Sequence, residues 1–186
     1  MSDRSFQRRR RTAYHEAGHA LAAWKLKIPF KRVSVVAADK TWHVLYPALL
    51  SGSDWDSIPP RARDRLERRM IVGLAGGEAE RLISGRSNHR GARSDYRNVW
   101  DIVSRLAGSI EEASAYSRWL SLRARSLIRA PQHRPSLDAL AAALMAQSKI
   151  DGVAAVTIMR DALLAATRAQ SMSPLEGNGE VEEARR

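Results

Sequence analysis

The stretch "TAYHEAGHALAAW", residues 12–24, decides how this chain folds around its chemistry. Its apolar residues recur at spacings of three and four, which is the period of an amphipathic helix. The apolar stripe continues to residue 28 and consists of Ala13, Ala17, Ala20, Leu21, Trp24 and Ile28. We therefore predict a helix from about residue 11 to residue 27, and Pro29 brings it to an end.

Two histidines lie in this helix four positions apart, and a glutamate follows the first. His15, Glu16 and His19 fit the pattern H-E-x-x-H. Residues four apart lie on one face of a helix, so their two imidazole nitrogens can approach a single metal ion. Glu16 is rotated by about 100° from His15. That position suits a general base beside a metal better than it suits a ligand.

The alternative is a helix that carries two unrelated histidines. With five histidines and ten glutamates in 186 residues, the pattern would arise by chance with a probability of about 0.007. Both histidines lie away from the apolar stripe, so we predict that they bind Zn²⁺. The chain has no cysteine, which means that further ligands must be histidine or carboxylate side chains.

A catalytic zinc site usually has three protein ligands and one open position for water. The H-E-x-x-H pattern supplies two ligands, and spacing alone leaves the third one open. Asp95 follows a loop that contains a glycine, whereas Glu80 lies on a predicted helix that can pack beside the first. The full set of candidates is Asp95, Glu78, Glu80, His43 and His89.

The rest of the chain predicts mostly helices. The β-branched stretch "KRVSVVAA" (31–38) favours a strand, and residues 42–50 favour a second one. Helices are predicted over about 61–84, 95–106, 111–129, 136–147 and 151–170, with Gly85, Ser94 and Asp151 as caps. The expected fold is mainly α (α+β): a helical bundle with a small sheet of one or two short strands beside the active-site helix.

Composition indicates one globular domain. Hydrophobic residues make up 44% of the chain and charged residues 27%. We expect a basic flexible arm at 1–10, a folded domain at 11–170 and a disordered tail at 171–186. We see no apolar run near the roughly 20 residues of a membrane helix. Together with the absence of cysteine, this favours a cytoplasmic protein without a membrane segment.

The net charge of +11 suggests acidic partners. Five arginines fall within residues 1–14 and five more within residues 118–134. This charge raises an alternative function, a basic binding or adaptor module for nucleic acid or acidic proteins with a structural or vestigial zinc site. We find no recognition motif with interleaved aromatic residues and no helix-turn-helix pattern, so nucleic acid ranks below polypeptides as a partner.

Five segments, in order, resemble the zinc-peptidase domain of the FtsH family of AAA+ proteases. "TAYHEAGHALAAW" resembles its active-site helix, "KRVSVV" its following strand, and "GLAGGEAERLISG" its Gly-Gly helix. "RGARSDYRNV" is similar to the segment that carries its third zinc ligand, and "LDALAAALMAQSKIDGVAAVTIM" to its closing helices. The resemblance implies that His15, His19 and Asp95 are ligands and that Glu16 is the general base. It makes Glu80 a supporting acidic residue.

The resemblance implies a zinc-dependent metalloendopeptidase that hydrolyses unfolded or flexible proteins with a zinc-activated water. Its partners would be polypeptide substrates, and a separate AAA+ ATPase and further copies of the chain are candidates. The chain departs from the family in three respects, one of which is a shorter segment between Asp95 and the late helices. It contains no G-x-x-x-x-G-K-[ST] motif, so we expect a stand-alone domain without the ATPase module. It also has "TWHVLYP" (41–47) where the family has Gly-Tyr-Thr.

A few further side chains invite two interpretations. Three aromatic residues could line a substrate groove: Trp42, Tyr46 and Trp55. We favour the alternative, in which they anchor the core or the loops. His43 and His133 are expected in loops or on the surface.

Overall fold

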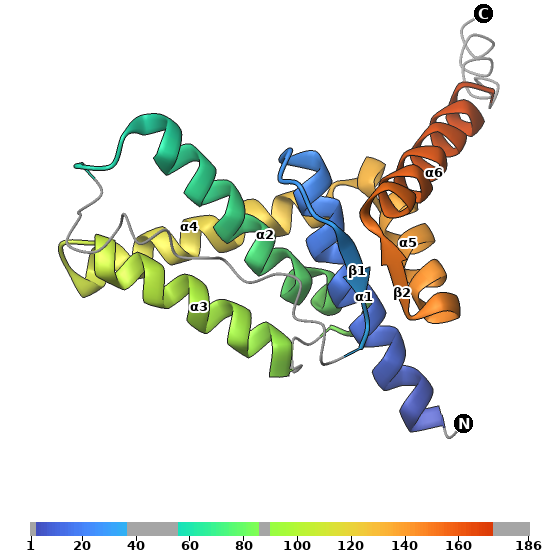
Figure 1. The fold of residues 1–186 in the computed structure, drawn as a ribbon, viewed down its shortest axis with the longest axis horizontal. Helices are drawn as coiled ribbons and strands as arrows, with labels where there is room; N and C mark the ends of the chain where they lie inside the picture. The colour runs from blue at the N-terminus through green and yellow to red at the C-terminus, as the bar shows by residue number, and fades with distance from the viewer. Residues whose placement is uncertain (1–2, 37–55, 86–89, 173–186) are drawn as a thin grey trace, which may run out of the picture.

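The computed structural model describes residues 3–36, 56–85 and 90–172 (Figure 1). Within these ranges the fold is mainly α with a small sheet, as the sequence predicts. The elements are α1 (Asp3–Lys25), β1 (Arg32–Ser34), α2 (Pro60–Ser84), α3 (Arg90–Leu106), α4 (Ile110–Arg129), a short 3₁₀ turn (Pro131–His133), α5 (Arg134–Gln147), β2 (Lys149–Asp151) and α6 (Gly152–Met172). Among the described helices, none combines the length and apolarity needed to cross a bilayer.

Helix α1 lies in the middle of the fold, in contact with α2 and α5 (Figure 1). From residue 13 to residue 23 it is buried on every side except at Glu16, which is half-buried. A helix buried all round belongs inside a domain. Gly18 permits the close approach of α2, because a Cβ atom there would stand 2.6 Å from the Cβ atom of Ala79.

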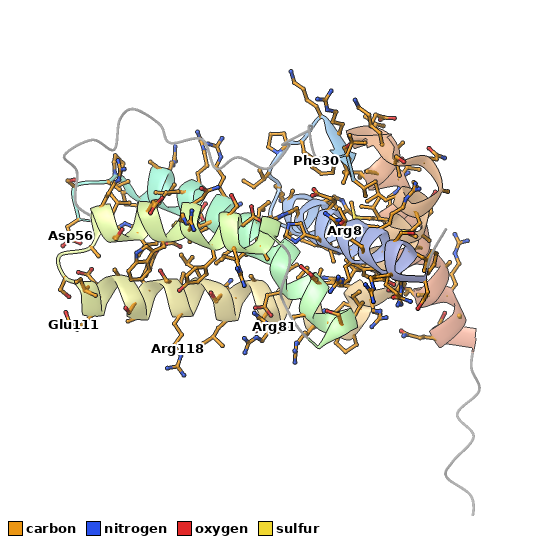
Figure 2. All side chains as sticks on the ribbon, turned by 90° about the horizontal axis from the view of Figure 1, so that it is seen from below. Arg8, Phe30, Asp56, Arg81, Glu111 and Arg118 are labelled. Atoms are coloured by element: carbon orange, nitrogen blue, oxygen red, sulfur yellow. The ribbon has the colours of Figure 1, made fainter. Side chains whose placement is uncertain are left out.

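Helix α2 spans two hydrophobic cores. Its C-terminal half packs against α1, and its residues Val72, Ala75 and Ala79 belong to the core that α1 shares with α5, α6 and the sheet. Its N-terminal half packs with α3 and α4 through residues that include Met70 and Leu74. Figure 2 shows α3 and α4 running side by side along this second core. Because α2 belongs to both cores, it fixes α3 relative to α1.

The two strands form an antiparallel pair. Val33 pairs with Ile150, and both side chains are buried. Strand β2 was not predicted, because three residues between two helices are too few for an alternating pattern. The predicted strand at 42–50 lies outside the described residues.

Two helix starts differ from the prediction. The arm at 1–10 was expected to be flexible, yet α1 is helical from Asp3 onward. Arginine is a good helix former, and Asp3 lies where an acidic side chain interacts favourably with the helix dipole. Arg9 also donates a hydrogen bond of 2.9 Å to Ser148 Oγ, which attaches this segment to the end of α5.

Helix α3 begins at Arg90 instead of Asp95, so Ser94 is not its N-cap. Alanine and arginine at residues 92 and 93 favour the helix and extend it backwards. Asp95 therefore projects from within the helix and not from its first residue. The other predicted caps are confirmed: Gly85 ends α2 with φ 69°, and Asp151 Oδ1 accepts hydrogen bonds from the N–H groups of Val153 and Ala154. Helix α6 continues to Met172, past the predicted start of the tail at 171.

A candidate metal centre

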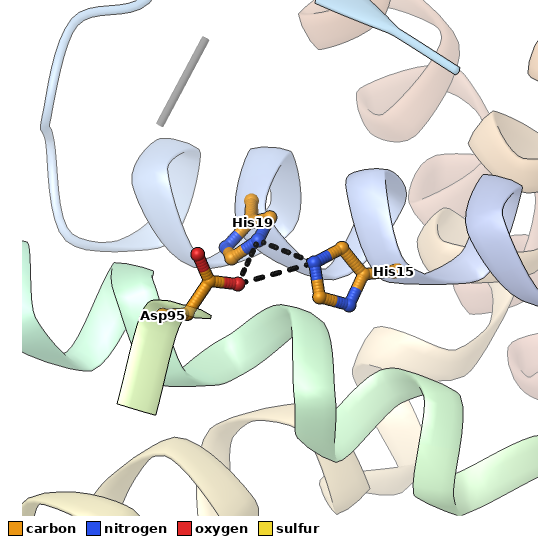
Figure 3. A group of neighbouring side chains, drawn as sticks. All are labelled: His15, His19 and Asp95. Atoms are coloured by element: carbon orange, nitrogen blue, oxygen red, sulfur yellow. Dashed lines mark hydrogen bonds and ion pairs between the residues drawn. The ribbon is translucent and has the colours of Figure 1, made fainter. Parts of the chain in front are cut away.

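Three side chains from two helices meet at one point. His15 and His19 extend from the same face of α1, and Asp95 reaches them from α3 (Figure 3). Asp95 Oδ2 lies 3.1 Å from His15 Nε2 and 3.2 Å from His19 Nε2. The two Nε2 atoms are 3.1 Å apart. Both histidines are buried, and Asp95 is 17% exposed.

The backbone of α2 fixes the orientation of His19. Its Nδ1 atom lies 2.7 Å from the carbonyl oxygen of Val72. A carbonyl oxygen only accepts hydrogen bonds, so Nδ1 must carry the proton. In the neutral ring Nε2 then has its lone pair directed toward Asp95 and His15. Metal-binding histidines are commonly held in this way by a hydrogen bond from the other ring nitrogen.

Glu80 lies behind His15. Its Oε2 atom is 3.9 Å from His15 Nδ1, and the Glu80 side chain is 1% exposed. A buried carboxylate on this side of the ring favours a proton on Nδ1 and leaves Nε2 to face Asp95. The structure places Glu80, which the resemblance made a supporting residue, behind His15 and not among the three converging atoms.

Gly76 leaves the space that the two rings occupy. A Cβ atom at this position of α2 would stand 2.4 Å from His19 Nε2 and 2.9 Å from His15 Cε1. Both distances are shorter than van der Waals contact, so any side chain there would displace the imidazole rings. The glycine therefore shapes the centre although it contributes no ligand atom.

The three groups create a negative site that attracts a cation. Burial raises the pKa of Asp95, but hydrogen bonds from the Nε2 atoms of His15 and His19, when these atoms carry a proton and no metal, outweigh burial and hold that pKa well below its usual range. Burial lowers the pKa of His19, while the hydrogen bond and charge of Asp95 outweigh it and raise that pKa above its ordinary value. Positive charge among these three atoms is thus favoured by the fold.

The geometry fits a tetrahedral zinc ion. Ligand atoms about 2.0–2.2 Å from a tetrahedral zinc stand roughly 3.3 Å from each other. The three separations here are 3.1, 3.1 and 3.2 Å. Two neutral imidazoles and one carboxylate are ligands that zinc accepts, and three protein ligands leave a fourth position for water. Among the described residues, His15, His19 and Asp95 form the group of histidine and acidic side chains whose ligand atoms lie close enough to share a metal ion.

The remaining predicted site residues lie apart from the three atoms or outside the described ranges. Glu16 follows His15 on α1 and is half-buried, which leaves part of its side chain accessible to water. Glu78 is buried in ion pairs with Arg81 and with Arg125, the latter at 3.2 Å. His133 Nδ1 lies 2.7 Å from the carbonyl oxygen of Leu127 in the α4–α5 connection. His43, His89, Trp42, Tyr46 and Trp55 lie outside the described residues.

Sequence reasoning missed the individual roles of Gly76 and Val72. The signal for Gly76 was the glycine pair inside "GLAGGEAE", where two poor helix formers in a row require a packing reason. No sequence signal marks Val72, because it contributes a backbone carbonyl group that every residue has.

Comparison with known proteins places the centre in context. The family model of peptidase family M41 matches residues 4–109, a range that includes His15, Glu16, His19 and Asp95. The chain is 37% identical over 101 residues to the ATP-dependent zinc metalloprotease YME1L1 of Rattus norvegicus, covering 51% of this chain and 13% of that protein. It is 33% identical over 100 residues to the ATP-dependent zinc metalloprotease FtsH of Thermus thermophilus, covering 53% of this chain and 15% of that protein.

These alignments span a small part of each relative, whereas the family match spans more than half of this chain. The resemblance expected for the closing helices, from residue 137 onward, lies outside the matched range. The converging histidines and aspartate, on the matched segment, lead to one conclusion: the chain belongs to peptidase family M41.

Proposed function

We propose that this protein is a zinc-dependent metalloendopeptidase that hydrolyses peptide bonds of unfolded or flexible polypeptides. The observation that carries the proposal is the triangle formed by His15 Nε2, His19 Nε2 and Asp95 Oδ2, with sides of 3.1–3.2 Å. Membership of a peptidase family supports it, and so do two relatives that are named zinc metalloproteases.

In this proposal His15, His19 and Asp95 act only as ligands of the metal. A bound zinc ion supplies Lewis acidity, which polarises a carbonyl oxygen and makes water more acidic. His19 is held against the carbonyl of Val72 and His15 faces Glu80, so neither ring needs to reorient when the metal binds. Asp95 brings one negative charge, which lowers the net charge of the site.

Glu16 acts as the general base. It follows His15 on α1 but, unlike both histidines, it is only half-buried, so its carboxylate can contact water. It takes a proton from the attacking water and delivers it to the amine that leaves. A carboxylate is suited to both steps, because it accepts the proton in the first and releases it in the second.

We expect the substrates of this domain to be polypeptide segments that are already unfolded. A compact domain of this kind can cleave only segments that are already disordered or locally opened. Both relatives are named ATP-dependent, and we propose that a separate AAA+ ATPase supplies unfolded chains to this domain, with self-association of the chain as a second possibility to be measured. Pull-down from native cell extract tests the partner: recovery of no ATPase argues against it.

The decisive comparison is Glu16→Gln against the wild type, with Glu111→Gln as a control for an exposed glutamate on α4. Glu16→Gln should retain zinc and lose cleavage of casein by about 10²–10⁴-fold. Glu111→Gln should leave both unchanged. Unchanged cleavage in Glu16→Gln would remove that residue from its role. A zinc-loaded wild type that cleaves neither casein nor any unfolded protein would favour the adaptor hypothesis.

A further inference from the structure

A second site lies between α2, α3 and α4. A cavity of about 810 Å³ opens there, within the size range of ligand-binding pockets. Leu74 and Trp100 supply apolar surface, and small residues of α2, Gly73 and Gly77, leave room for a ligand. Four arginines line it: Arg81, Arg93, Arg97 and Arg125.

The cavity carries a strong positive charge. Four arginines line the cavity, and Glu78 is the one acidic residue in the described part of its lining. Glu78 pairs with both Arg81 and Arg125, and so holds these two side chains in place. Arg93 and Arg97 are exposed, and no acidic side chain among the described residues lies within ion-pair distance of either. Two guanidinium groups are therefore available to a ligand that brings carboxylates.

The cavity adjoins the metal centre through shared helical turns. Gly76 contacts the imidazole rings, and the next residue, Gly77, lines the cavity. Asp95 belongs to the centre, and the next residue, Tyr96, lines the cavity with Ala92 one turn earlier. Along both α2 and α3 the cavity therefore lies within one helical turn of the centre.

We propose that this cavity binds acidic side chains of the polypeptide substrate and gives the peptidase a preference for acidic segments. The inference rests on the proposed function, because it assigns the cavity to the same substrate. The arginines provide paired donors for carboxylates, while Trp100 and Tyr96 contact the aliphatic parts of the chain. The net charge of +11 adds a long-range attraction for acidic chains.

The test measures binding separately from cleavage. Two fluorescein-labelled peptides, identical except for three glutamates replaced by glutamine, are titrated with the Glu16→Gln protein, and fluorescence anisotropy is recorded. The acidic peptide should bind about tenfold more tightly, as expected for hydrogen bonds to a charged group. The difference should shrink as salt is raised from 50 mM to 500 mM, values that bracket physiological screening.

A matched pair of double variants separates the cavity from bulk charge. Arg93→Gln/Arg97→Gln removes the two available guanidinium groups and should bring the two peptides within about twofold of each other. Arg118→Gln/Arg129→Gln removes the same charge from exposed positions of α4 that do not line the cavity, and it should preserve the difference. Figure 2 shows Arg118 pointing away from the helices. Circular dichroism confirms that both variants fold.

Two results would overturn the inference: equal binding of both peptides by the parent protein, or an equal loss in both double variants. A short single-stranded oligonucleotide that binds the parent protein more tightly than the acidic peptide does, with this advantage lost only in Arg93→Gln/Arg97→Gln, would also overturn it, in favour of a nucleic-acid ligand. Casein cleavage without acidic preference would contradict this inference alone. Acidic-peptide binding in the cavity without casein cleavage by the wild type would contradict the proposed function alone.

Discussion

Gly76 of α2 and His19 of α1 are so close that a methyl group on Gly76 would stand 2.4 Å from His19 Nε2. The imidazole ring therefore occupies the volume that a side chain of α2 would normally fill. This relationship gives a physical reason for a glycine in the middle of a helix, where it costs about 1 kcal/mol relative to alanine.

The first prediction concerns that contact. Gly76→Ala should lower zinc affinity by about 10–100-fold, because the added methyl group must displace His19 from its position against Val72. The measurement is competition for zinc against a chromophoric chelator. Gly85→Ala is the control: Gly85 has φ 69° and open space around it, so alanine there should cost about 1 kcal/mol of stability and leave zinc affinity intact. Equal zinc affinity in Gly76→Ala and wild type would contradict the steric argument.

The second prediction compares two buried glutamates of the same helix. Glu80→Gln should weaken zinc binding by about tenfold or more. The negative charge of Glu80 beside His15 Nδ1 favours a proton on that atom, which leaves Nε2 free to bind the metal. Glu78→Gln should leave zinc affinity within about twofold, because Glu78 pairs with Arg81 and Arg125 and not with the histidines. Isothermal titration with zinc distinguishes the two. Unchanged zinc affinity in Glu80→Gln would show that Glu80 has no part in the centre.

The third prediction concerns metal removal. Zinc at 100 times its dissociation constant should stabilise the wild type by about 2.7 kcal/mol, and a chelator should remove that gain. Asp95→Ala should gain less than half as much from the same zinc, because one of the three ligand atoms is lost. Thermal unfolding with and without the chelator provides the comparison. The same zinc-dependent shift in both proteins would exclude Asp95 as a ligand.

The fourth prediction concerns pH and the packing of α4 on α2. Burial raises the pKa of Tyr116, and its hydrogen bond to Glu67 raises that pKa further. The folded state thus holds this proton more tightly than the unfolded chain does. The resulting stability is present below about pH 10 and is lost as the pH rises from there toward the folded pKa.

Tyr116→Phe should therefore lose about 1 kcal/mol at pH 8 and show a shallower decline in stability between pH 9 and 11, a range around the ordinary tyrosine pKa. Urea unfolding at a series of pH values checks both effects. Tyr96→Phe, whose tyrosine is 48% exposed, should follow the wild type. An identical pH slope in Tyr116→Phe and wild type would show that the hydrogen bond to Glu67 does not persist in solution.

The long helices were predictable from the sequence, because their apolar spacing repeats over several turns. Helices α2, α4 and α5 begin within two residues of the predicted positions. Short elements and irregular starts were not predictable. Strand β2 has three residues, and its only distinguishing feature is the pairing of Ile150 with Val33, which becomes visible only in the fold. Helix α3 starts early because Ala92 and Arg93 favour the helix in spite of Gly91, although Ser94 looked like a cap.

Some residues of the metal centre could also be predicted from the sequence, and others could not. His15 and His19 were predictable because their spacing equals one helical turn. Asp95 was one of several carboxylates until a family resemblance selected it, since no local pattern indicates that α3 will lie beside α1. The contributions of Val72 and Gly76 depend on the contact between α1 and α2. A tertiary contact of that kind carries no periodic signal along either helix.

If the proposed function is right, His15, His19 and Asp95 share one zinc ion. Crystals of the zinc-loaded protein, measured on both sides of the zinc absorption edge, test it most directly. We expect a single anomalous peak about 2.0–2.2 Å from His15 Nε2, His19 Nε2 and an Asp95 carboxylate oxygen, with a fourth position open to solvent. A peak bound elsewhere, or an Asp95 side chain turned away from a zinc held by the histidines alone, would contradict it.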